Sequence, residues 1–457
     1  MGYPFEHWKL AEWAVKSIQA YKDMHFPDDN TDYSCGMSFD NVIDYLFERG
    51  ISADYNKPMT REQIKRMGEN KCRTVYNNIK ATHNLVSVCN VKAKDLEITD
   101  TDRFTYLLTY SFPCQDLSSA GLSKGMAKGS GTRSGLLWEI ERILKECDEL
   151  PQVLLMENVP EVIGQKNKDS FADWIAFLDS MGYKSKWEIL NGTDFEIPQN
   201  RKRCFMVSAL GDYYYDFPQK LGCTLRLKDL LEKNVSEEYY LSDNILNYFI
   251  KHTKECEEKG KGVLISQCEC LGMLEGDKWD NLLDANRRVY STEKASPTIT
   301  TCGGVQREVK ILEPLLLGGI GDKKSNSGTQ WYQQDRIYDS NGVAMAHCAS
   351  IPNGSYNYGV QEPLALDEQN GYIRQDGTVE TIVTDGSSPK HNNRVVEPMP
   401  NMRVRKLTPR ECFRLMGVKD EDYERVAENQ SKSSLYHLAG DSIVVNVLMA
   451  IFKELFM

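Results

Sequence analysis

Short apolar runs alternate with amphipathic stretches along the first half of the chain. One run begins at Tyr106 and leads into Phe-Pro-Cys-Gln, a second begins at Val153 and leads into Glu-Asn-Val-Pro, and a third ends at Val207. Apolar runs of this length, bounded by turn residues, predict buried strands. Because stretches with helical spacing separate these strands, the chain is predicted to be an α/β protein with a parallel sheet.

Apolar residues recur at helical spacing between and beyond these strands. The helices expected from this spacing cover residues 10–24, 132–144 and 171–181. The polar segment 28–85 is expected to be a helical insertion, in which Thr60 and Gln63 have the spacing of a capping box. The stretch 85–91 is expected to be a further strand.

The C-terminal part carries similar helix signals. Thr408 is expected to cap a helix that starts at Pro409, and Glu411 completes a second capping box. The last helix is expected to start at Asp441 and Ser442, because apolar residues recur every four positions after them. Its wide apolar stripe needs a covering surface, so this segment is expected to return to the first domain.

The chain changes character between about 225 and 400. Helical pieces at 227–232 and 243–260 precede short strand-like pieces among many Gly, Ser and Asn residues. We therefore expect three parts. They are a main α/β domain over 1–224, a smaller loop- and strand-rich domain over 225–400, and a C-terminal segment over 401–457.

Composition and charge narrow the class of protein. The 457 residues, 41% of them hydrophobic, can build a large core and argue against disorder. No apolar run reaches about 18 residues, so no membrane-spanning helix is expected, and the first residues lack a signal-peptide pattern. The net charge of −11 argues against a chain that coats nucleic acid, although basic residues cluster locally. The clusters are Arg201–Arg203 and the group Arg403, Arg405, Lys406, Arg410 and Arg414.

The chain has 13 cysteines and no CxxC pair, which favours reduced thiols in a cytoplasm over disulfides. Cys268 and Cys270 are too close together and too isolated to predict a zinc site. No metal is therefore expected. Most of the cysteines are expected to be small buried side chains.

Cys114 differs from the others by its place at the end of a predicted strand, after Pro113 and before a run rich in Gly and Ser. Chemistry in α/β sheets lies just beyond the carboxyl ends of strands. Glu157 ends the next strand, and Arg201 and Arg203 alternate into the third, which places both on one face. Taken singly, Cys114 is better explained as an inert thiol, Glu157 as a strand-end charge, and Arg201 and Arg203 as a solvated strand edge. Together they can form one pocket.

Five motifs occur in a characteristic order. They are Ser-Phe-Pro-Cys-Gln, Met-Glu-Asn-Val, Pro-Gln-Asn-Arg-Lys-Arg, Arg405-Lys-Leu-Thr-Pro-Arg-Glu-Cys and Gly440-Asp-Ser-Ile-Val-Val. This series resembles the motifs of the cytosine-C5 DNA methyltransferases of bacterial or phage type, over most of the chain outside about 225–400. The resemblance implies a Rossmann-like class I methyltransferase domain, a target-recognition domain over 225–400, double-stranded DNA as substrate and S-adenosylmethionine as cofactor.

The resemblance also implies roles for the residues of the pocket. A target cytosine is swung out of the duplex, the Cys114 thiolate attacks C6 of its ring, and Glu157 holds the ring N3 and amino group. Arg203 is expected to donate to the ring O2, and Arg201 to order the pocket. The loop after Cys114 is expected to close over the flipped base, and polar and aromatic residues over 331–356 to read base edges.

The implied cofactor-binding residues come from several parts of the chain. They are Glu12, Trp13, Asn90, Val91, Pro113, Leu136, Asp441 and Ser442. Glu12 is expected to bind the ribose hydroxyl groups, Trp13 to pack on the adenine, and Asn90, where the family has Asp, to bond the adenine amino group. The family has Asn where Asp441 stands, and Asp places a negative charge next to the methionine carboxylate of the cofactor.

The chain departs from the family at its start. The family opens with a strand and a Phe-x-Gly-x-Gly turn that carries the methionine end of the cofactor, and the residues before Glu12 do not supply that turn. We expect that the chain starts late, that another chain supplies this strand, or that the cofactor site is defective.

The predicted function is DNA (cytosine-5)-methyltransferase, in a restriction–modification setting that can include a cognate restriction endonuclease. The alternative is a catalytically impaired DNA-binding remnant. A tRNA substrate is disfavoured by the size of the 225–400 region, which suits a reader of duplex sequence.

Overall fold

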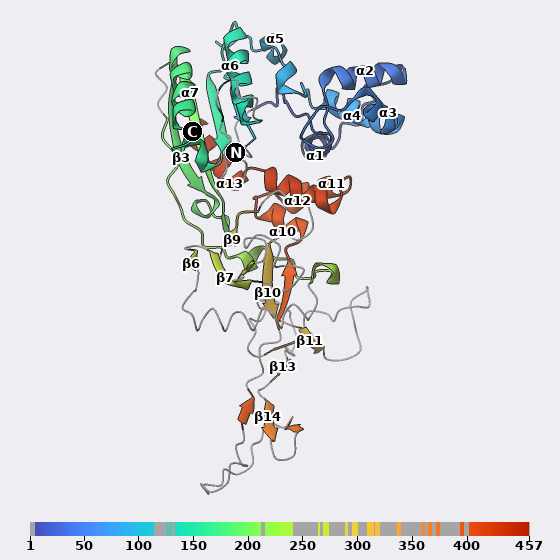
Figure 1. The fold of residues 1–457 in the computed structure, drawn as a ribbon, viewed down its shortest axis with the longest axis vertical. Coiled ribbons are helices and arrows are strands. Elements are labelled where there is room, and N and C mark those ends of the chain that lie inside the picture. The colour runs from blue at the N-terminus through green and yellow to red at the C-terminus, as the bar shows by residue number, and fades with distance from the viewer. Residues whose placement is uncertain are drawn as a thin grey trace. The chain divides into compact units, whose positions relative to one another are not determined.

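A computed structural model of the chain describes residues 5–113, 126, 128, 133–211, 215–240, 295–299, 309–314 and 402–456, with further short strands between 264 and 396. The chain forms two compact units, which can be followed in Figure 1. The first unit comprises Met1–Glu232, Lys294–Arg307 and Thr408–Met457, and the second comprises Lys233–Glu293 and Glu308–Leu407. The segment Lys294–Arg307, inside the predicted 225–400 domain, thus belongs to the first unit.

The first unit contains a four-stranded sheet with the order β1-β2-β5-β3. Its strands are β1 (Leu107–Ser111), β2 (Val153–Asn158), β3 (Tyr183–Asn191) and β5 (Lys202–Leu210). The α/β fold class is confirmed, but only β1 and β2 are parallel, since β5 runs antiparallel to both β2 and β3. A parallel neighbour needs a crossover of a dozen or more residues, whereas only the short segment 192–201 joins β3 to β5.

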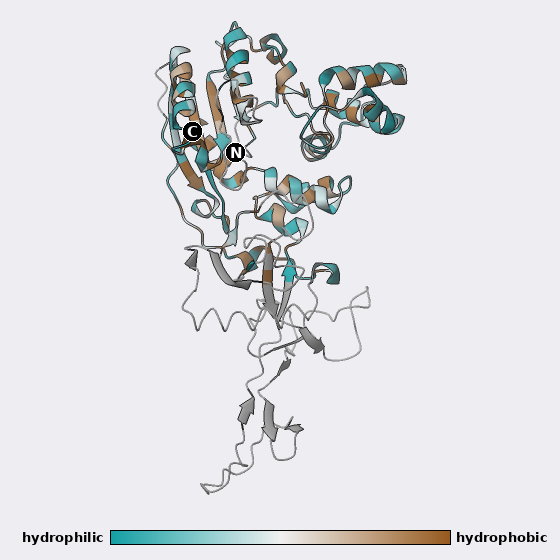
Figure 2. Ribbon diagram, viewed as in Figure 1, coloured by the Kyte–Doolittle hydropathy of each residue, from teal (hydrophilic) through white to brown (hydrophobic). Residues whose placement is uncertain are grey.

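Helices cover both faces of this sheet. They are α6 (Leu137–Glu146) and α7 (Lys168–Ser180) on one face and α13 (Val445–Phe456) on the other. β2 is buried along its whole length because its alternate residues face two cores. Leu154 and Met156 pack with α6 and α7, and Val153 and Leu155 pack with α13. Figure 2 shows hydrophobic residues, in brown, along parts of this sheet.

The predicted insertion over 28–85 folds as helices that share one core with α1 (Val15–His25), the helix before it. The helices of the insertion are α2 (Phe39–Arg49), α3 (Arg61–Arg66) and α4 (Glu69–Ala81). The buried residues of the shared core include Ile18, Ile43, Leu46, Ile64 and Ile79. The capping box is confirmed, because the Thr60 hydroxyl accepts from the N–H of Gln63 and the Gln63 side chain accepts from the N–H of Thr60.

The helix predicted to begin at Leu10 begins later, at the start of α1. The residues before α1 are extended, because Leu10 pairs with Asn84 and Ala14 pairs with Ser52 in parallel bridges. Long-range pairing thus overrides the helical spacing of this stretch. Glu12 consequently stands before the helix.

The strand predicted over 85–91 is wrong. These residues lead into a 3₁₀ helix, η1 (Val88–Asn90), which is followed by α5 (Ala93–Leu96). Val86 has a positive φ of 70°, a conformation that does not continue a strand.

The C-terminal segment begins with the helix expected after Thr408. The helices of this segment are α10 (Pro409–Arg414), α11 (Asp420–Ala427), α12 (Lys432–Asp441) and α13. The Thr408 hydroxyl accepts from the N–H of Glu411, the Glu411 carboxylate accepts from the N–H of Thr408, and Pro409 takes the first helical position. The second capping box is therefore confirmed.

The prediction that the last helix starts at Asp441 is wrong. Asp441 is the last residue of α12, and α13 starts at Val445. Ser431 caps α12 by accepting from the N–H of Ser434, so the helix that contains Asp441 already has its start upstream.

The segment Lys432–Phe456 meets a membrane-span criterion by length and composition, with a mean hydropathy of 1.6 over its most apolar window. In the structure it is two helices, α12 and α13, joined at 442–444. Val447, Ile451 and Leu455 of α13 are buried against the sheet. The segment therefore belongs to the core of the first unit.

The second unit is built from short strands. One sheet has the order β17-β10-β8-β7-β6, from β6 (Leu264–Ile265), β7 (Cys268–Met273), β8 (Arg288–Tyr290), β10 (Lys310–Pro314) and β17 (Met402–Lys406). Two further sheets contain β11 (Leu316–Gly319), β12 (Arg336–Asp339) and β13 (Gly359–Gln361), and β14 (Leu364–Asp367), β15 (Tyr372–Arg374) and β16 (Arg394–Val396). In the first unit β4 (Gln199–Asn200) pairs with β9 (Ser296–Pro297). The helix predicted over 243–260, and most residues predicted to read bases, lie outside the described residues.

Candidate active site

The candidate active site lies at the sheet edge where β1 and β2 end. The two strands are parallel, and Ser111 at the end of β1 pairs with Glu157 near the end of β2. Cys114 follows Ser111 by three positions and, like the loop after it, lies outside the described residues. Pro113, the last described residue before it, is half-buried. The described backbone up to Pro113 therefore leads toward this edge.

The Glu157 carboxylate has two described partners here. Its Oε2 atom accepts a hydrogen bond from Oγ of Ser111 at 3.1 Å, and its Oε1 atom lies 3.1 Å from Nε of Arg203. The side chains of Glu157 and Arg203 are only 11% and 17% exposed, so the pair is largely shielded from solvent. Shielding strengthens both contacts and holds the carboxylate in one orientation.

The direction of β5 explains why Arg203 reaches Glu157. Because β5 is antiparallel to β2, its start lies beside the end of β2, and Glu157 pairs with Phe205. Arg203 is two positions before Phe205 and on the same face, and diagonal neighbours of this kind are within reach of a long side chain. The structure thus brings together two of the predicted catalytic residues.

Ser111 and Asn158 were not predicted as part of this edge. The buried Nδ2 of Asn158 donates to the backbone oxygen of Phe112 at 3.0 Å, and its Oδ1 accepts from the N–H of Val159 at 2.9 Å. Asn158 therefore ties the backbone before Pro113 to the end of β2. The sequence signal was a polar amide at the end of an apolar strand, since buried amides are usually hydrogen-bonded.

Arg201 lies apart from this ion pair. Its side chain is buried and donates to three backbone oxygens: Nη1 to Ile299 at 2.9 Å, and Nη2 to Gly440 at 2.8 Å and Ser442 at 2.9 Å. The prediction that it shares a face with Arg203 assumed strand alternation, but β5 begins only after Arg201. Arg201 clamps two distant segments of the first unit to the start of β5.

We expect Arg201→Met to lower the free energy of unfolding by about 3 kcal/mol or more, because three carbonyl groups lose their donor at about 1–3 kcal/mol each. Denaturant unfolding of the purified variant measures this change. Lys202→Met, which removes an exposed charge from the next residue, is the control and should stay within about 0.5 kcal/mol of the wild type. Equal losses in the two variants would contradict the clamp.

A second group of predicted residues comes from two places in the chain, the segment before α1 and the end of α12. Oε1 of Glu12 accepts from the N–H of Ala14 at 2.7 Å. Burial raises the pKa of the Glu12 carboxyl to about 7, the N–H groups of Ala14 and Trp13 oppose the rise, and the nearby Asp441 carboxylate adds to it. Two acidic side chains predicted to bind the cofactor are therefore close to each other.

The Glu12 carboxyl should make stability depend on pH. Its pKa is raised on folding, so its contribution is full below about pH 4.5 and is lost as the pH rises through about 7. The shift corresponds to about 3 kcal/mol, which solvent reduces because the side chain is only half-buried. We expect Glu12→Gln to raise the free energy of unfolding by about 1–2 kcal/mol at pH 8 and by little at pH 4. Denaturant unfolding at both pH values tests this, with the exposed Glu48→Gln as control; a gain equal to that of the control at pH 8 would refute it.

The surroundings of Glu12 suit the hydroxyl groups of a ribose. Among the described residues, backbone N–H groups are the hydrogen-bond donors to this carboxylate. A half-buried carboxylate with so few donors gains from two hydroxyl donors of a ligand. The residues therefore fit the expected cofactor at Glu12, while Asp441 adds a negative charge beside it.

Asn90 ends the 3₁₀ helix η1 and Val91 follows it, and Asn90 lies beside the end of α2. Nδ2 of Asn90 donates to the backbone oxygens of Glu48 at 3.3 Å and Arg49 at 3.4 Å, at the end of α2. Val91 is buried in a small core with Ile143. Both residues also line a cavity of about 560 Å³ together with Cys89, Lys92, Arg142 and Glu146.

The remaining predicted cofactor residues have structural partners. Trp13 packs on the core of the helical insertion, and Leu136, directly before α6, packs on the sheet core. Oγ of Ser442 donates to the backbone oxygen of Leu438 at 2.7 Å and closes α12. The cofactor roles of these residues stay predictions.

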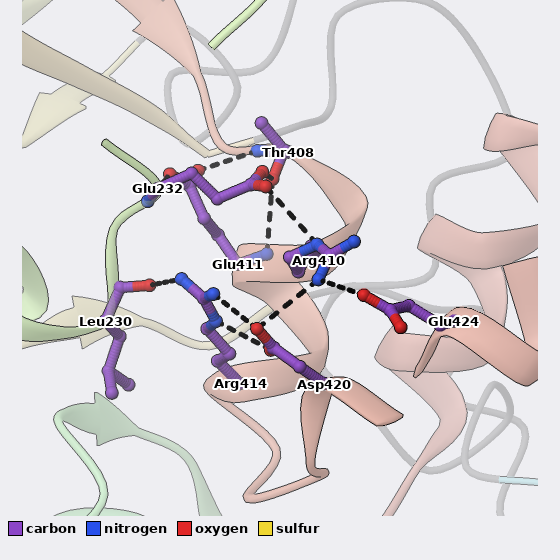
Figure 3. A network of polar contacts seen from close by, with 8 residues as sticks. All are labelled: Leu230, Glu232, Thr408, Arg410, Glu411, Arg414, Asp420 and Glu424. Atoms are coloured by element: carbon purple, nitrogen blue, oxygen red, sulfur yellow. Dashed lines mark hydrogen bonds and ion pairs between the residues drawn. The ribbon is translucent and has the colours of Figure 1, made fainter. Parts of the chain in front are cut away.

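Two arginines of the C-terminal basic cluster, Arg410 and Arg414, are paired with acidic side chains (Figure 3). Nη1 of Arg410 lies 3.0 Å from Oε1 of Glu424, and Nε of Arg414 donates to Oδ1 of Asp420 at 2.8 Å. Arg405 is fully buried. These three arginines therefore do not form the free basic surface that the charge pattern suggested.

The same network joins two points where the chain passes between its units. Oγ1 of Thr408 donates to Oε2 of Glu232 at 2.5 Å, and the N–H of Glu232 donates to Oε1 of Glu411 at 2.8 Å. Nη1 of Arg414 donates to the backbone oxygen of Leu230 at 2.9 Å. Glu232 ends the first segment of the first unit, and Thr408 begins its last segment. Figure 3 shows that both residues are bonded to residues of α10.

The part of the chain that the structure describes has no group of three or more His, Cys, Asp and Glu side chains that could hold a metal ion. Seven cysteines of the described residues are free thiols: Cys35, Cys72, Cys89, Cys147, Cys204, Cys223 and Cys412.

Comparison with known proteins identifies relatives of this chain. The family model described as C-5 cytosine-specific DNA methylase matches residues 61–457. The orphan methyltransferase M.SssI of Spiroplasma monobiae is 34% identical over 323 residues, which are 70% of this chain and 77% of the relative. The type II methyltransferase M2.ScrFI of Lactococcus lactis subsp. cremoris is 31% identical over 420 residues, 91% of this chain and 82% of the relative.

Solved structures with a similar course of the chain are more distant. The S. pombe Dnmt2 methyltransferase matches with a TM-score of 0.43 and 17% identity, over 85% of this chain and 89% of that one. The Entamoeba histolytica methyltransferase EhMeth matches with a TM-score of 0.47 and 14% identity, over 99% of this chain and 100% of that one.

Proposed function

Because the chain belongs to the C-5 cytosine-specific DNA methylase family, we propose that it methylates C5 of cytosine in duplex DNA, with S-adenosylmethionine as the methyl donor. The observation that carries this proposal is the shielded contact of Glu157 with Arg203 and Ser111, at the edge to which the chain before Cys114 leads. A carboxylate and a guanidinium held side by side offer acceptor and donor groups to the polar edge of a pyrimidine.

The target base must leave the duplex to reach this edge, because ring atoms C5 and C6 are not accessible to a nucleophile inside the stack. Glu157 then accepts a hydrogen bond from the amino group of the flipped cytosine and shares a proton with N3, and Arg203 donates to O2. Arg201 acts indirectly, by fixing the start of the strand that carries Arg203.

Cys114 supplies the nucleophile. Its thiolate sulfur forms a bond to C6, and the electrons of the C5–C6 double bond move toward C5 and the N3 side of the ring. Arg203, and a proton shared between N3 and the Glu157 carboxyl, neutralise the negative charge that develops there. C5 thereby becomes nucleophilic, and bound S-adenosylmethionine would supply the electrophilic methyl group, its carbon–sulfur bond breaking to leave a neutral thioether. A base then removes the C5 proton, the C6–sulfur bond breaks, and the thiolate is restored.

Glu12 and Asp441 are proposed to receive the cofactor, Glu12 through the ribose hydroxyl groups and Asp441 near the methionine end. Trp13, Asn90, Val91, Pro113, Leu136 and Ser442 are proposed to complete the site. The second unit is proposed to read the DNA sequence.

The purified chain tests this function when it is incubated with duplex DNA and S-adenosylmethionine labelled in its methyl group. We expect label in 5-methylcytosine of the duplex, and little in tRNA. Label in tRNA alone, or in adenine, would overturn the proposal. The alternative of a DNA-binding remnant has no observation in its favour.

We also propose that a further strand pairs with β1 and carries the methionine end of the cofactor site. β1 is the outermost strand of the described sheet. The ring of Trp8 lies 6.1 Å from that of Tyr106, the residue directly before β1, so the segment before Glu12 comes close to the start of this strand. Another chain can supply such a strand. Full methyl transfer by this chain alone would argue against a supplied strand.

The relatives support a bacterial or phage restriction–modification setting in a cytoplasm. One relative is named a type II methyltransferase and the other an orphan methyltransferase. For a type II methyltransferase, the proposed partner is a cognate restriction endonuclease. Such a nuclease would be identified by its cleavage of the same duplex only when that duplex is unmethylated.

A further inference from the structure

Tyr55, in the helical insertion, has a backbone conformation that tyrosine rarely adopts. Its φ is +60°, in the left-handed region that favours glycine. The loop around it holds this conformation, because Oδ1 of Asp54 accepts from the N–H of Asn56 at 3.0 Å and Oγ of Ser52 donates to the backbone oxygen of Lys57 at 2.8 Å. Strain of this kind persists where the surrounding structure fixes it and is common at functional sites.

The Tyr55 side chain joins two other segments of the first unit. Its hydroxyl lies 2.9 Å from Oγ of Ser17 in the first turn of α1. Its ring centroid lies 4.5 Å from that of His437 in α12, with the planes tilted by 46°. One side chain thus connects the loop of the insertion to α1 and to α12.

The same side chain lies close to the two carboxylates at this site. Burial raises the pKa of the Tyr55 hydroxyl to about 12, the Ser17 hydrogen bond opposes the rise, and the charges of Glu12 and Asp441 add to it. Oδ2 of Asp441 lies 3.0 Å from Nε2 of His437, one helical turn away on α12. Tyr55 therefore stands where Glu12, His437 and Asp441 meet.

We propose that Tyr55 is a positioning residue of the cofactor site. Its ring packs on the His437 imidazole, whose Nε2 lies 3.0 Å from Oδ2 of Asp441. Held at this place, the imidazole limits the repulsion that Asp441 exerts on Glu12 and on the cofactor carboxylate. The inference rests on the proposed function, because it concerns the two side chains proposed to receive S-adenosylmethionine. It also gives the insertion over 28–85 a part in cofactor binding.

Calorimetric titration of the full chain with S-adenosylmethionine tests the role of Tyr55. Tyr55→Gly removes the ring and suits the φ of +60°, so backbone strain cannot account for its effect. We expect Kd to rise about tenfold in this variant, and to stay within about threefold in Tyr55→Phe, which keeps the ring. Tyr45→Ala is the matched control: it removes a half-buried ring that packs 4.7 Å from Tyr76 within the insertion, and it should leave Kd within about threefold.

A double-mutant cycle separates positioning from general loss of structure. If Tyr55 acts through the charge of Asp441, the tenfold rise should shrink to less than about threefold when Tyr55→Gly is combined with Asp441→Asn. An unchanged Kd in Tyr55→Gly, or the same rise in both backgrounds, overturns the role of Tyr55 alone. A wild-type chain that does not bind S-adenosylmethionine overturns the proposed cofactor site, and this inference falls with it.

Discussion

Cys114→Ala is expected to abolish methyl transfer to duplex DNA, with a loss of about 10⁴-fold or more in kcat. Without the sulfur, no bond forms to C6, and C5 of the cytosine ring remains too weak a nucleophile to accept a methyl group. The affinity for S-adenosylmethionine should stay within about threefold, because the proposed cofactor contacts lie on other residues. Transfer of labelled methyl groups and calorimetric titration measure the two quantities separately.

Other thiols of the chain provide the controls. Cys35 is exposed and Cys147 is half-buried, and neither lies at the strand-end edge, so Cys35→Ala and Cys147→Ala should keep their activity. DNA with fluorine in place of the C5 hydrogen of the target cytosine should trap the wild type covalently, because the ring then has no C5 proton to lose. Trapping of Cys114→Ala, or its normal activity, would show that the nucleophile is another group.

The strands that build this edge could be predicted because their sequence signals are local and do not compete with others. The runs that end at Ser111 and Glu157 are apolar, short and bounded by turn residues, and both fold as expected. The direction of β5 could not be read in the same way. The apolar pattern of a strand is the same whichever way the strand runs. β5 is antiparallel because its connection from β3 is short, and this direction brings Arg203 to Glu157.

The errors at the helix boundaries have a common physical cause. The local pattern allows a helix to start at Leu10 and at Asp441. The actual helix starts lie elsewhere, because of a distant pairing partner in the case of Leu10 and an earlier cap in the case of Asp441. Leu10 pairs with Asn84, far along the chain, and Ser431 starts the helix that Asp441 ends. Spacing and capping preferences do not contain such long-range or competing contacts.

Charge was the least informative signal. The sequence shows that Arg410 and Arg414 lie close together, but not that Glu424 and Asp420 face them. The same holds for Arg201, whose acceptors are backbone oxygens that no side-chain pattern reveals. A basic cluster in a sequence therefore indicates a nucleic-acid surface only after its possible acidic partners are known.

Glu157→Gln separates binding of the base from activation of the base, and we expect it to lower kcat about 10²–10³-fold. The amide keeps the size of the carboxylate and can still pair with the ring N3 and amino group, so the flipped cytosine should bind nearly as well. It has no acidic proton to share with N3, so it cannot neutralise the negative charge that builds on the ring, and it leaves Arg203 without the carboxylate that lies 3.1 Å from it. The loss should therefore appear in kcat and not in KM, which is the pattern of an interaction made in the transition state.

Glu188→Gln provides the matched control, because Glu188 lies on β3 of the same sheet and its partner is the exposed Lys220. This variant should keep kcat within about twofold, since a surface ion pair contributes little. Methyl transfer measured over a range of DNA concentrations gives kcat and KM for both variants. A rise in KM alone for Glu157→Gln would mean that Glu157 only holds the base, and the activation of C5 would then have to come from Cys114 and Arg203 without it.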